Sequence, residues 1–416
     1  MKKTLRYLLY LLLALVITAA VAIFLVVKIA LAPAPGEWSM RAQAGPIAFD
    51  VGVPTAIRVA TAPWFAPRLD GHSLETRHGP VRFAWNDASQ TLEATCAPCS
   101  ASVPEFGADP IRLERLVVTA RRDVAVLNGT LEATQGSAPA IRGRWDGRLT
   151  QKTLQLNIEM AEAPVAQWYA VLAPHLPELQ RARIGGTLAL KAQVALPAGS
   201  YALQPVLSQF SVEGLGTDAM LNARTGCGPS ARLGADSWLA RAVLAAEDQR
   251  FFQHPGYDLV ELGAATAANQ KAGHVERGGS TLTQQLVKLL VTGSERTGER
   301  KLRELLYAVE MEQTLGKARI LQLYLDNAPW GGETCGAEAA ARRYFKRSAS
   351  KLEPAQAVWL AAMLHNPGAE IAQWQRSGNI DAARAKWVAE GIRPILRGQR
   401  ESLLRAVAAA RFVPPG

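Results

Sequence analysis

Two neighbouring carboxylates begin the first group of residues that could carry out chemistry. Glu247 and Asp248 precede Phe251 and His254, where an apolar helix is expected to end and the chain turns at Pro255-Gly256. Clustering two carboxylates and an imidazole beside an apolar helix is costly unless the groups are exposed or paired at a functional site. Alone, such residues would more often mark a solvated helix end, so their interpretation depends on the groups that follow.

A glycine pair with hydroxyl and amide side chains forms the second group. Residues 277–288 read RGGSTLTQQLVK, so Gly278-Gly279 opens a helix whose first turn offers hydroxyls and free N–H groups. Such a helix start suits an anion, although an ordinary Ser or Thr N-cap gives the same pattern. Thr281, Gln285 and Lys288 are expected on one helix face. The phosphate loop of nucleotide-binding enzymes is excluded, because its glycine spacing and its Lys-Ser/Thr ending are missing.

Two further stretches lie on expected helices. Residues 300–304 read RKLRE, which places Arg300 and Lys301 beside Glu304 on one helix. Alone, this pattern usually marks a surface salt bridge of little energetic consequence. Residues 317–327 read KARILQLYLDN.

In this order, the four stretches resemble the motifs of the family 51 peptidoglycan glycosyltransferases: E-D-x-x-F-x-x-H-x-G, G-G-S-T-x-T-Q-Q-L, R-K-x-x-E and K-x-x-I-L-x-x-Y-L. The likeness covers about residues 237–367. Several motifs in the right order are far more specific than any one of them alone. The resemblance implies a mainly α, lysozyme-like domain with a small lobe that dips into the membrane.

The resemblance also implies roles for individual residues. Glu247 is expected to be the general base, and Glu304 to lie across a cleft, near the donor pyrophosphate. A divalent cation, Mg²⁺ or Mn²⁺, is expected with Glu304 as its possible ligand, and no organic cofactor is expected. The residues expected to bind substrate are Asp248, Phe251, His254, Ser280, Thr281, Gln284, Gln285, Lys288, Arg300 and Lys301.

Two positions depart from the family pattern. Gln322 stands where the family usually has Glu, and Asp326 stands where it usually has Asn. Both are expected to support packing around the cleft rather than to perform the reaction. No S-x-x-K, S-x-N or K-T-G set follows in the sequence, so we expect no penicillin-binding transpeptidase domain.

The composition is that of a basic protein large enough for more than one core. The sequence has 416 residues, 49% of them hydrophobic, and a formal net charge of +10 at pH 7. The length favours two soluble domains behind one membrane segment. The charge favours anionic partners such as pyrophosphate or acidic lipid headgroups, and nucleic acid is not expected.

An uncharged apolar run, residues 7–27, is long enough to cross a bilayer as one helix. Lys2, Lys3 and Arg6 precede it, which keeps the N-terminus in the cytoplasm and sends the rest of the chain across. A cleaved signal peptide is the alternative, but its apolar core is usually shorter. Residues 1–36 are therefore expected to be a cytoplasmic tip and a single-pass inner-membrane anchor, with the catalytic domain on the periplasmic side.

Residues 37–216 are expected to form a β-rich extracytoplasmic domain of unknown role. Apolar and polar side chains alternate as in half-buried strands, with residues 80–85 and 153–158 as examples. Residues 127–130 and 145–147 are predicted turns, and a short helix is expected near residues 164–176. The domain is interpreted either as a spacer or as a module that binds cell-wall synthesis proteins.

Residues 217–416 are expected to be mainly α-helical and to form the glycosyltransferase domain. Asp236 is the expected N-cap of the first helix, which has an apolar face that includes Leu239 and Val243. Further helices are expected at residues 259–271, 280–290, 300–315, 317–324, 337–344 and 354–364.

Cys96, Cys99, Cys227 and Cys335 are an even number of cysteines in an expected oxidising compartment. Cys96 and Cys99 form a CxxC that could be a local disulfide, a redox pair or half of a metal site. The local disulfide is favoured, since no second CxxC and no nearby His accompany it. A bridge between Cys227 and Cys335 would close a long loop in the second domain.

These features together predict a peptidoglycan glycosyltransferase that meets lipid II, the growing glycan chain and membrane lipid outside the cytoplasm. It would release undecaprenyl pyrophosphate by an inverting transfer. The enzymatic alternative is a lysozyme-like lytic enzyme, which needs no group that holds pyrophosphate. The non-enzymatic alternative is an inactive cell-wall scaffold, against which the intact Glu247 and Glu304 argue.

Overall fold

The computed structural model describes residues 18, 25, 28–44, 47–101, 110–274, 278–293 and 298–414. The predicted anchor, residues 7–27, lies outside the described residues apart from Thr18 and Leu25, and Arg277 also lies outside them. Within the part of the chain that is described, no helix combines the length and apolar character that crossing a bilayer requires.

The chain divides into two compact units, each made of several segments. The first unit comprises Met1–Ala101, Arg112–Ala163 and Leu188–Val206, and the second comprises Ser102–Ile111, Pro164–Thr187 and Leu207–Gly416. A β-rich N-terminal region is therefore followed by a helical C-terminal one, as the sequence predicted.

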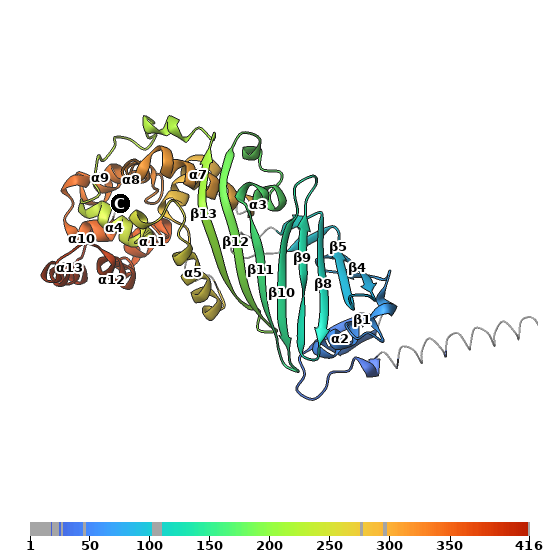
Figure 1. Ribbon diagram of the computed structural model, residues 1–416. Helices are drawn as coiled ribbons and strands as arrows, with labels where there is room; N and C mark the ends of the chain where they lie inside the picture. The colour runs from blue at the N-terminus through green and yellow to red at the C-terminus, as the bar shows by residue number, and fades with distance from the viewer. Residues whose placement is uncertain are drawn as a thin grey trace, which may run out of the picture. The chain divides into compact units, whose positions relative to one another are not determined.

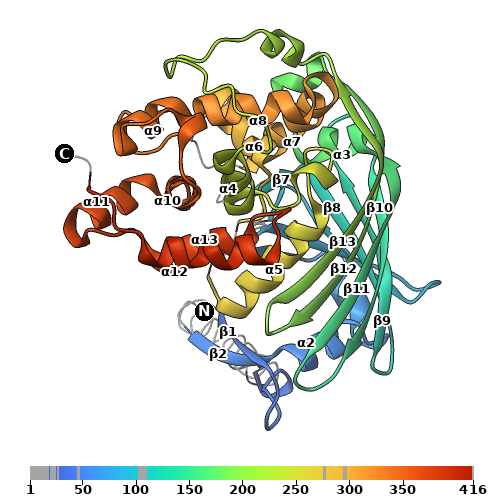
Figure 2. The same ribbon diagram turned by 90° about the vertical axis from the view of Figure 1, so that its left-hand side faces the viewer.

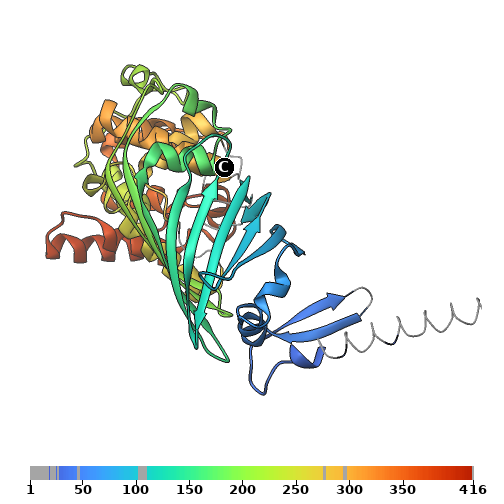
Figure 3. The same cartoon turned by 45° about the vertical axis from the view of Figure 1, so that its right-hand side comes forward.

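Antiparallel strands make up most of the first unit. The strands, in chain order, are β1 (Ser39–Ala44), β2 (Ile47–Gly52), β3 (Ser73–Thr76), β4 (Gly79–Asn86), β5 (Thr91–Cys96), β6 (Cys99–Ala101), β7 (Ile111–Leu113), β8 (Arg115–Asp123), β9 (Val126–Thr134), β10 (Ile141–Leu149), β11 (Leu154–Pro164), β12 (Arg183–Leu196) and β13 (Ser200–Glu213). Among the described residues, nine of them form one sheet in the order β13-β12-β11-β10-β9-β8-β5-β4-β3, whose strands can be followed in Figure 1. The hairpin of β1 and β2 lies next to the helix α2 (Val53–Ala60), as Figure 3 shows, and a short turn of helix, η1 (Ala66–Leu69), precedes β3.

The sheet has one polar and one apolar face, as the alternating sequence predicted. Between β10 and β11, Arg144 stands opposite Glu159 on the polar face, and Leu149 stands opposite Leu154 on the apolar face. Leu127, Leu149 and Leu154 form a buried cluster on this second face. The predicted strands at residues 80–85 and 153–158 fall largely within β4 and β11 and are confirmed.

The two predicted turns are wrong, because residues 127–130 lie inside β9 and residues 145–147 lie inside β10. Gly129 stands opposite Trp145 in this pair of strands. A Cβ on Gly129 would lie 1.7 Å from the carbonyl oxygen of Thr119, and 2.9 Å from the indole nitrogen of Trp145. That nitrogen donates a hydrogen bond to the same carbonyl at 3.1 Å. The glycine therefore makes room for an indole inside the sheet and does not reverse the chain.

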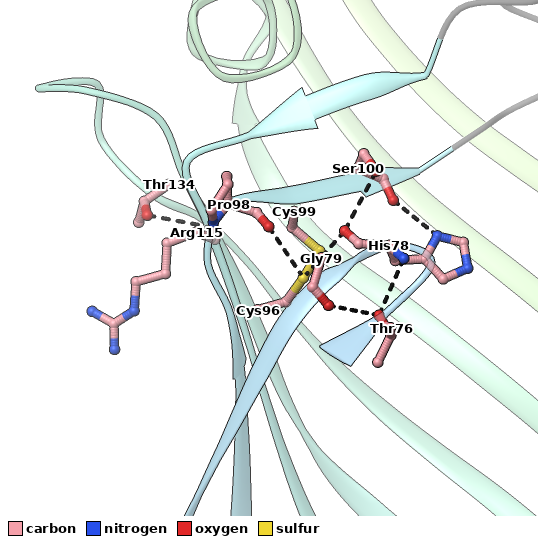
Figure 4. The surroundings of a disulfide bond; sticks show 9 residues. All are labelled: Thr76, His78, Gly79, Cys96, Pro98, Cys99, Ser100, Arg115 and Thr134. Atoms are coloured by element: carbon pink, nitrogen blue, oxygen red, sulfur yellow. Dashed lines mark hydrogen bonds between the residues drawn. A yellow bond between two sulfur atoms is a disulfide. The ribbon is translucent and has the colours of Figure 1, made fainter. Parts of the chain in front are cut away.

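Cys96 and Cys99 form a disulfide within the first unit, as favoured from the sequence. Cys96 ends β5 and Cys99 begins β6. Figure 4 shows the bridge beside Gly79 and His78, where the hydroxyl of Ser100 and its amide both donate to the carbonyl of His78. A Cβ on Gly79 would lie 2.1 Å from the carbonyl oxygen of Pro98, so this tight corner requires glycine.

The second unit is mainly α-helical. Its helices are α3 (Val165–Leu172), η3 (Pro177–Gln180), η4 (Thr217–Leu221), α4 (Trp238–Glu247), η5 (Phe251–Gln253), α5 (Leu259–Ala272), α6 (Leu282–Val287), η6 (Lys288–Thr292), α7 (Gly298–Thr314), α8 (Gly316–Asn327), α9 (Ala337–Phe345), η7 (Ala349–Lys351), α10 (Pro354–Met363), α11 (Pro367–Ser377), α12 (Ala382–Gly391) and α13 (Arg397–Ala409). Every helix predicted for residues 217–416, and the short helix predicted near residues 164–176, overlaps one of these. Figure 2 shows α4, α6, α7 and α8 gathered together, and α6 packs on both α7 and α8 while α4 packs on α10.

The predicted N-cap of α4 is wrong by one residue. Ser237, not Asp236, is the cap, and its hydroxyl accepts a hydrogen bond from the amide of Ala240. Both residue types cap helices well, so the sequence alone could not choose between neighbours. From this start, Leu239 and Val243 are buried on the apolar face, and α4 ends at Glu247.

Cys227 and Cys335 form the second disulfide, as the sequence suggested. It ties the segment before α4 to the loop that precedes α9. The two departures from the family pattern lie beside it. Asp326 accepts hydrogen bonds from the hydroxyl of Ser230 at 2.6 Å and from the amide of Ala231 at 3.0 Å. Gln322 accepts one from Arg319 at 3.1 Å. Its side-chain amide donates to the hydroxyl of Ser230 at 3.4 Å, so both side chains organise the segment around Ser230.

Candidate active site

Glu247 occupies the last position of α4, and its carboxyl group is almost entirely buried, with 11% of the side chain exposed. Oε2 accepts a hydrogen bond from the side-chain amide of Gln285 at 3.0 Å. Oε1 is buried and has no hydrogen-bond partner among the described residues. The guanidinium of Arg384 lies 3.8 Å from Oε1. One oxygen of Glu247 is thus held and the other is left for a further donor.

Burial raises the pKa of Glu247 above its ordinary value, and the hydrogen bond from Gln285 and the charge of Arg384 act in the opposite direction. A carboxylate with a raised pKa is a stronger base than an exposed one. The position and the electrostatics therefore suit Glu247 for taking a proton.

Gln285 is fixed by a second partner. The hydroxyl of Tyr324, from α8, donates to the amide oxygen of Gln285 at 3.1 Å. Because that oxygen is occupied by a donor, the amide nitrogen is the group that faces Glu247. Tyr324 is buried, and burial raises its pKa well above the ordinary value, so its hydroxyl stays a donor. This chain of two hydrogen bonds fixes the orientation of the Glu247 carboxyl group.

Asp248 and His254 form a buried pair next to Glu247. Nε2 of His254 lies 3.0 Å from Oδ2 of Asp248, and Nδ1 accepts a hydrogen bond from the amide of Gly256 at 3.2 Å. Since Nδ1 is an acceptor, the proton of a neutral imidazole lies on Nε2 and is donated to Asp248. Oδ2 of Asp248 also accepts from the amide of Leu282 at 2.8 Å. The pair therefore connects the end of α4 to the start of α6.

Glu304, on α7, is 1% exposed and is held by two cations. Arg300 pairs with Oε1, and the ammonium of Lys301 lies 2.9 Å from Oε2. The prediction from helical spacing that both cations lie beside Glu304 is confirmed. The three groups carry one net positive charge, because two cations face one carboxylate.

Residues 280–285 connect the two acids. Lys301 donates a hydrogen bond to the hydroxyl of Ser280 at 2.7 Å, and Gln285 donates to Glu247. Glu304 is thus linked through Lys301 to one end of this segment, and Glu247 contacts its other end. The structure brings the two predicted catalytic acids to the same short stretch of chain.

Some predicted substrate-binding residues have structural partners within the domain. Thr281 is the N-cap of α6 and forms a capping box with Gln284. Its hydroxyl also donates to the carbonyl of Gly256 at 2.8 Å, so the ordinary N-cap interpretation describes it well. Phe251 is 1% exposed and lies under the ammonium of Lys317 at 4.3 Å. Lys288 is exposed at the start of η6. Substrate roles for these residues stay predictions.

Two residues of this site were not chosen from the sequence. Tyr324 lies within the fourth motif, and this position could have identified it as a site residue. Arg384, on α12, lies beyond the stretch that carries the resemblance, and no local pattern singles it out. Its guanidinium donates to the carbonyl of Ala246 at 3.0 Å and lies 4.4 Å from the centre of the Trp387 ring. Only the packing of α12 near the end of α4 identifies it.

The described residues do not offer a protein cage for a divalent cation. Both oxygens of Glu304 are taken by Arg300 and Lys301. Across the described part of the chain, no group of three or more His, Cys, Asp or Glu side chains is arranged to hold a metal ion. Mg²⁺ is often held by one or two carboxylates together with substrate phosphates. A cation that binds together with a pyrophosphate therefore stays a proposal.

The fold and the site define a helical domain with two buried acidic side chains. It has one buried carboxyl group suited to take a proton and a second acid held beside two cations. Such a pair suits enzymes that make or break glycosidic bonds, in which one group moves a proton and another stabilises charge.

Comparisons with known proteins identify this domain. The family model described as Transglycosylase matches residues 234–393. A biosynthetic peptidoglycan transglycosylase from Alcanivorax borkumensis is 45% identical over 151 residues, which cover 36% of this chain and 61% of that protein. Proteins of the same name from Nitrosomonas eutropha and Thiobacillus denitrificans are each 47% identical over 129 residues, or 31% of this chain and 53% and 56% of theirs.

Residues 234–393 are therefore a family 51 glycosyltransferase domain, as the four motifs indicated. The chain spans between about half and three fifths of the length of these relatives. The matched region lies entirely within the second unit.

Proposed function

We propose that this protein polymerises lipid II into peptidoglycan glycan strands by inverting glycosyl transfer. The observation that carries the proposal is the free buried oxygen of Glu247, next to an oxygen fixed by Gln285. A general base needs a held carboxylate with one oxygen open toward the hydroxyl that it deprotonates. The family domain at residues 234–393 supports the same class of reaction.

In the proposed step, Oε1 of Glu247 takes the proton of the 4-hydroxyl of the acceptor lipid II. The hydroxyl oxygen then forms a bond to the anomeric carbon of the growing chain. The bond between that carbon and the pyrophosphate oxygen breaks on the opposite face, and undecaprenyl pyrophosphate leaves with the electron pair. The configuration at the anomeric carbon is inverted.

The leaving pyrophosphate needs stabilisation by positive charge. Arg300, Lys301 and Glu304 supply one net positive charge on a single helical turn of α7. In the proposal, Glu304 holds the two cations in place near the donor, and the exposed Lys288 adds a further charge. A lytic enzyme has no leaving pyrophosphate and would have no use for this group.

The proposal includes a location. A substrate with a polyprenyl tail stays in the bilayer, so we propose that residues 7–27 anchor the chain in the inner membrane with the catalytic domain on the periplasmic side. The two disulfides agree with an oxidising compartment. The β-rich unit would then be available to cell-wall synthesis proteins.

The test is incubation of the detergent-solubilised full chain with purified lipid II, and separately with finished glycan strands. We expect polymer from lipid II, inhibition by moenomycin in line with the family resemblance, and no shortening of finished strands. Shortening of finished strands without polymer formation would instead identify a lytic enzyme.

A further inference from the structure

A segment outside the family domain contributes to the second unit. α3 and η3 lie within residues 164–187, which belong to the same compact unit as the helices of the glycosyltransferase domain. The family match begins only at residue 234. Part of the segment is buried, since Val171 is 0% and Glu178 is 2% exposed.

Glu178 forms an ion pair with Arg303 of α7, in which the carboxylate is buried and the side chain of Arg303 is 31% exposed. Oε1 of Glu178 accepts from Nε of Arg303 at 2.8 Å and lies 2.7 Å from Nη2 of the same side chain. The hydroxyl of Tyr307, one turn further along α7, donates to Oε1 at 3.4 Å. Arg181 donates to that hydroxyl at 2.8 Å. The hydrogen bond to Glu178 raises the pKa of Arg303.

A second contact reaches the same turn of α7. The hydroxyl of Tyr169, on α3, donates to the carbonyl of Leu302 at 3.1 Å. Leu302 and Arg303 stand between Lys301 and Glu304 in the sequence. The segment therefore contacts the turn of α7 that also carries Arg300, Lys301 and Glu304, the residues of the proposed pyrophosphate site.

Removing the buried carboxylate leaves the charge of Arg303 uncompensated, and we expect the structure around it to shift. A shift of α7 would move Arg300, Lys301 and Glu304 together, because all three belong to the same turns of one rigid helix. Geometry at a reacting centre is sensitive to displacements of about 1 Å.

We propose that Glu178 is a positioning residue for the donor site: through Arg303 it sets the placement of the α7 turn that carries Arg300, Lys301 and Glu304. The inference rests on the proposed function for the identity of the ligand, a polyprenyl pyrophosphate. It assigns to a segment preceding the family domain an indirect part in the reaction, exerted through α7.

The test uses the full chain with two variants. Glu178→Gln keeps the size of the side chain and removes its charge, and the double variant Glu178→Gln/Arg303→Met removes both charges. Glu132→Gln, in β9 at an exposed ion pair with Arg142 of β10, is the matched control and should behave as the wild type. We measure the melting temperature, kcat/KM on lipid II, and equilibrium binding of undecaprenyl pyrophosphate.

Glu178→Gln should lower the melting temperature and lower kcat/KM by between about 10-fold and 100-fold. The double variant should recover most of the melting temperature, because no unpaired charge is left beside α7, while kcat/KM and pyrophosphate binding stay low. Recovery of kcat/KM in step with the melting temperature would show a merely structural role and overturn the proposal. Unchanged kcat/KM in Glu178→Gln would overturn it as well.

The binding measurement distinguishes failure of the proposed function from failure of the positioning role of Glu178. If the wild type binds undecaprenyl pyrophosphate but forms no polymer, the proposed function fails, and the positioning role is still read from the binding of the variants. Equal binding by wild type and both variants would overturn the positioning role alone.

Discussion

The two disulfides should contribute very differently to stability, because they close loops of very different length. Cys227 and Cys335 are 108 residues apart, while Cys96 and Cys99 are 3 apart. In the chain-entropy treatment, a crosslink stabilises a fold by restricting its unfolded chain, and the effect grows with the logarithm of the loop length. The long loop gives about 4.8 kcal/mol at 25 °C and the short loop about 1.6 kcal/mol. The expected difference is about 3.2 kcal/mol.

The assay is guanidinium unfolding of the full chain, comparing wild type with Cys227→Ser/Cys335→Ser and with Cys96→Ser/Cys99→Ser. Each pair is replaced together, so no free thiol is left to form a mixed disulfide. The first variant should lose the larger free energy, in the transition of the helical unit that contains both cysteines. Equal losses, or a larger loss from the Cys96 and Cys99 variant, would refute the reasoning from loop length.

Three further predictions concern the site and its surroundings. Arg384→Gln should raise the pKa of Glu247 further, because the cation that favours the carboxylate is gone. The acidic limb of the pH–rate profile should therefore move to higher pH, and an unchanged limb would contradict this prediction. Asp326→Ala should destabilise the domain by roughly 2 kcal/mol in thermal unfolding, since Ser230 and Ala231 lose their acceptor. Asp326→Asn keeps one acceptor oxygen and should destabilise the domain less. Equal losses of stability in the two variants would count against the two hydrogen bonds. Glu247→Gln should melt no lower than wild type at pH 8. Because the folded pKa of Glu247 is raised, its contribution to stability is full below its ordinary pKa and is lost as the pH rises through the folded pKa. A drop in the melting temperature of the variant would contradict the assigned burial.

The helices around the site were predictable because local signals agreed with the packing. Residues 259–271 and 337–344 show helical spacing and fall within α5 and α9. The pairing of Arg300 and Lys301 with Glu304 follows from helical geometry alone. An even cysteine count likewise predicted both bridges, since each half of the chain contains two cysteines.

The errors and omissions concern contacts between distant parts of the chain. Asn128-Gly129 has the composition of a turn, but its role is set by Trp145 on the neighbouring strand, which no local pattern reveals. Arg384 reaches Glu247 only after α12 packs near α4. Glu178 meets Arg303 across 125 residues of sequence, with strands in between. Such pairs appear only when the fold is known, because neither partner has a distinctive neighbour in sequence.

Polymerisation of purified lipid II by the Glu247→Gln variant is the most direct test of the central idea, that one buried carboxylate takes the proton of the acceptor sugar. Glutamine has nearly the same shape and cannot act as a base, and the hydrogen bond with Gln285 can be kept after a rotation of the new amide. We expect a folded variant with glycan synthesis reduced at least about 100-fold. Near-normal synthesis by this folded variant would contradict the account.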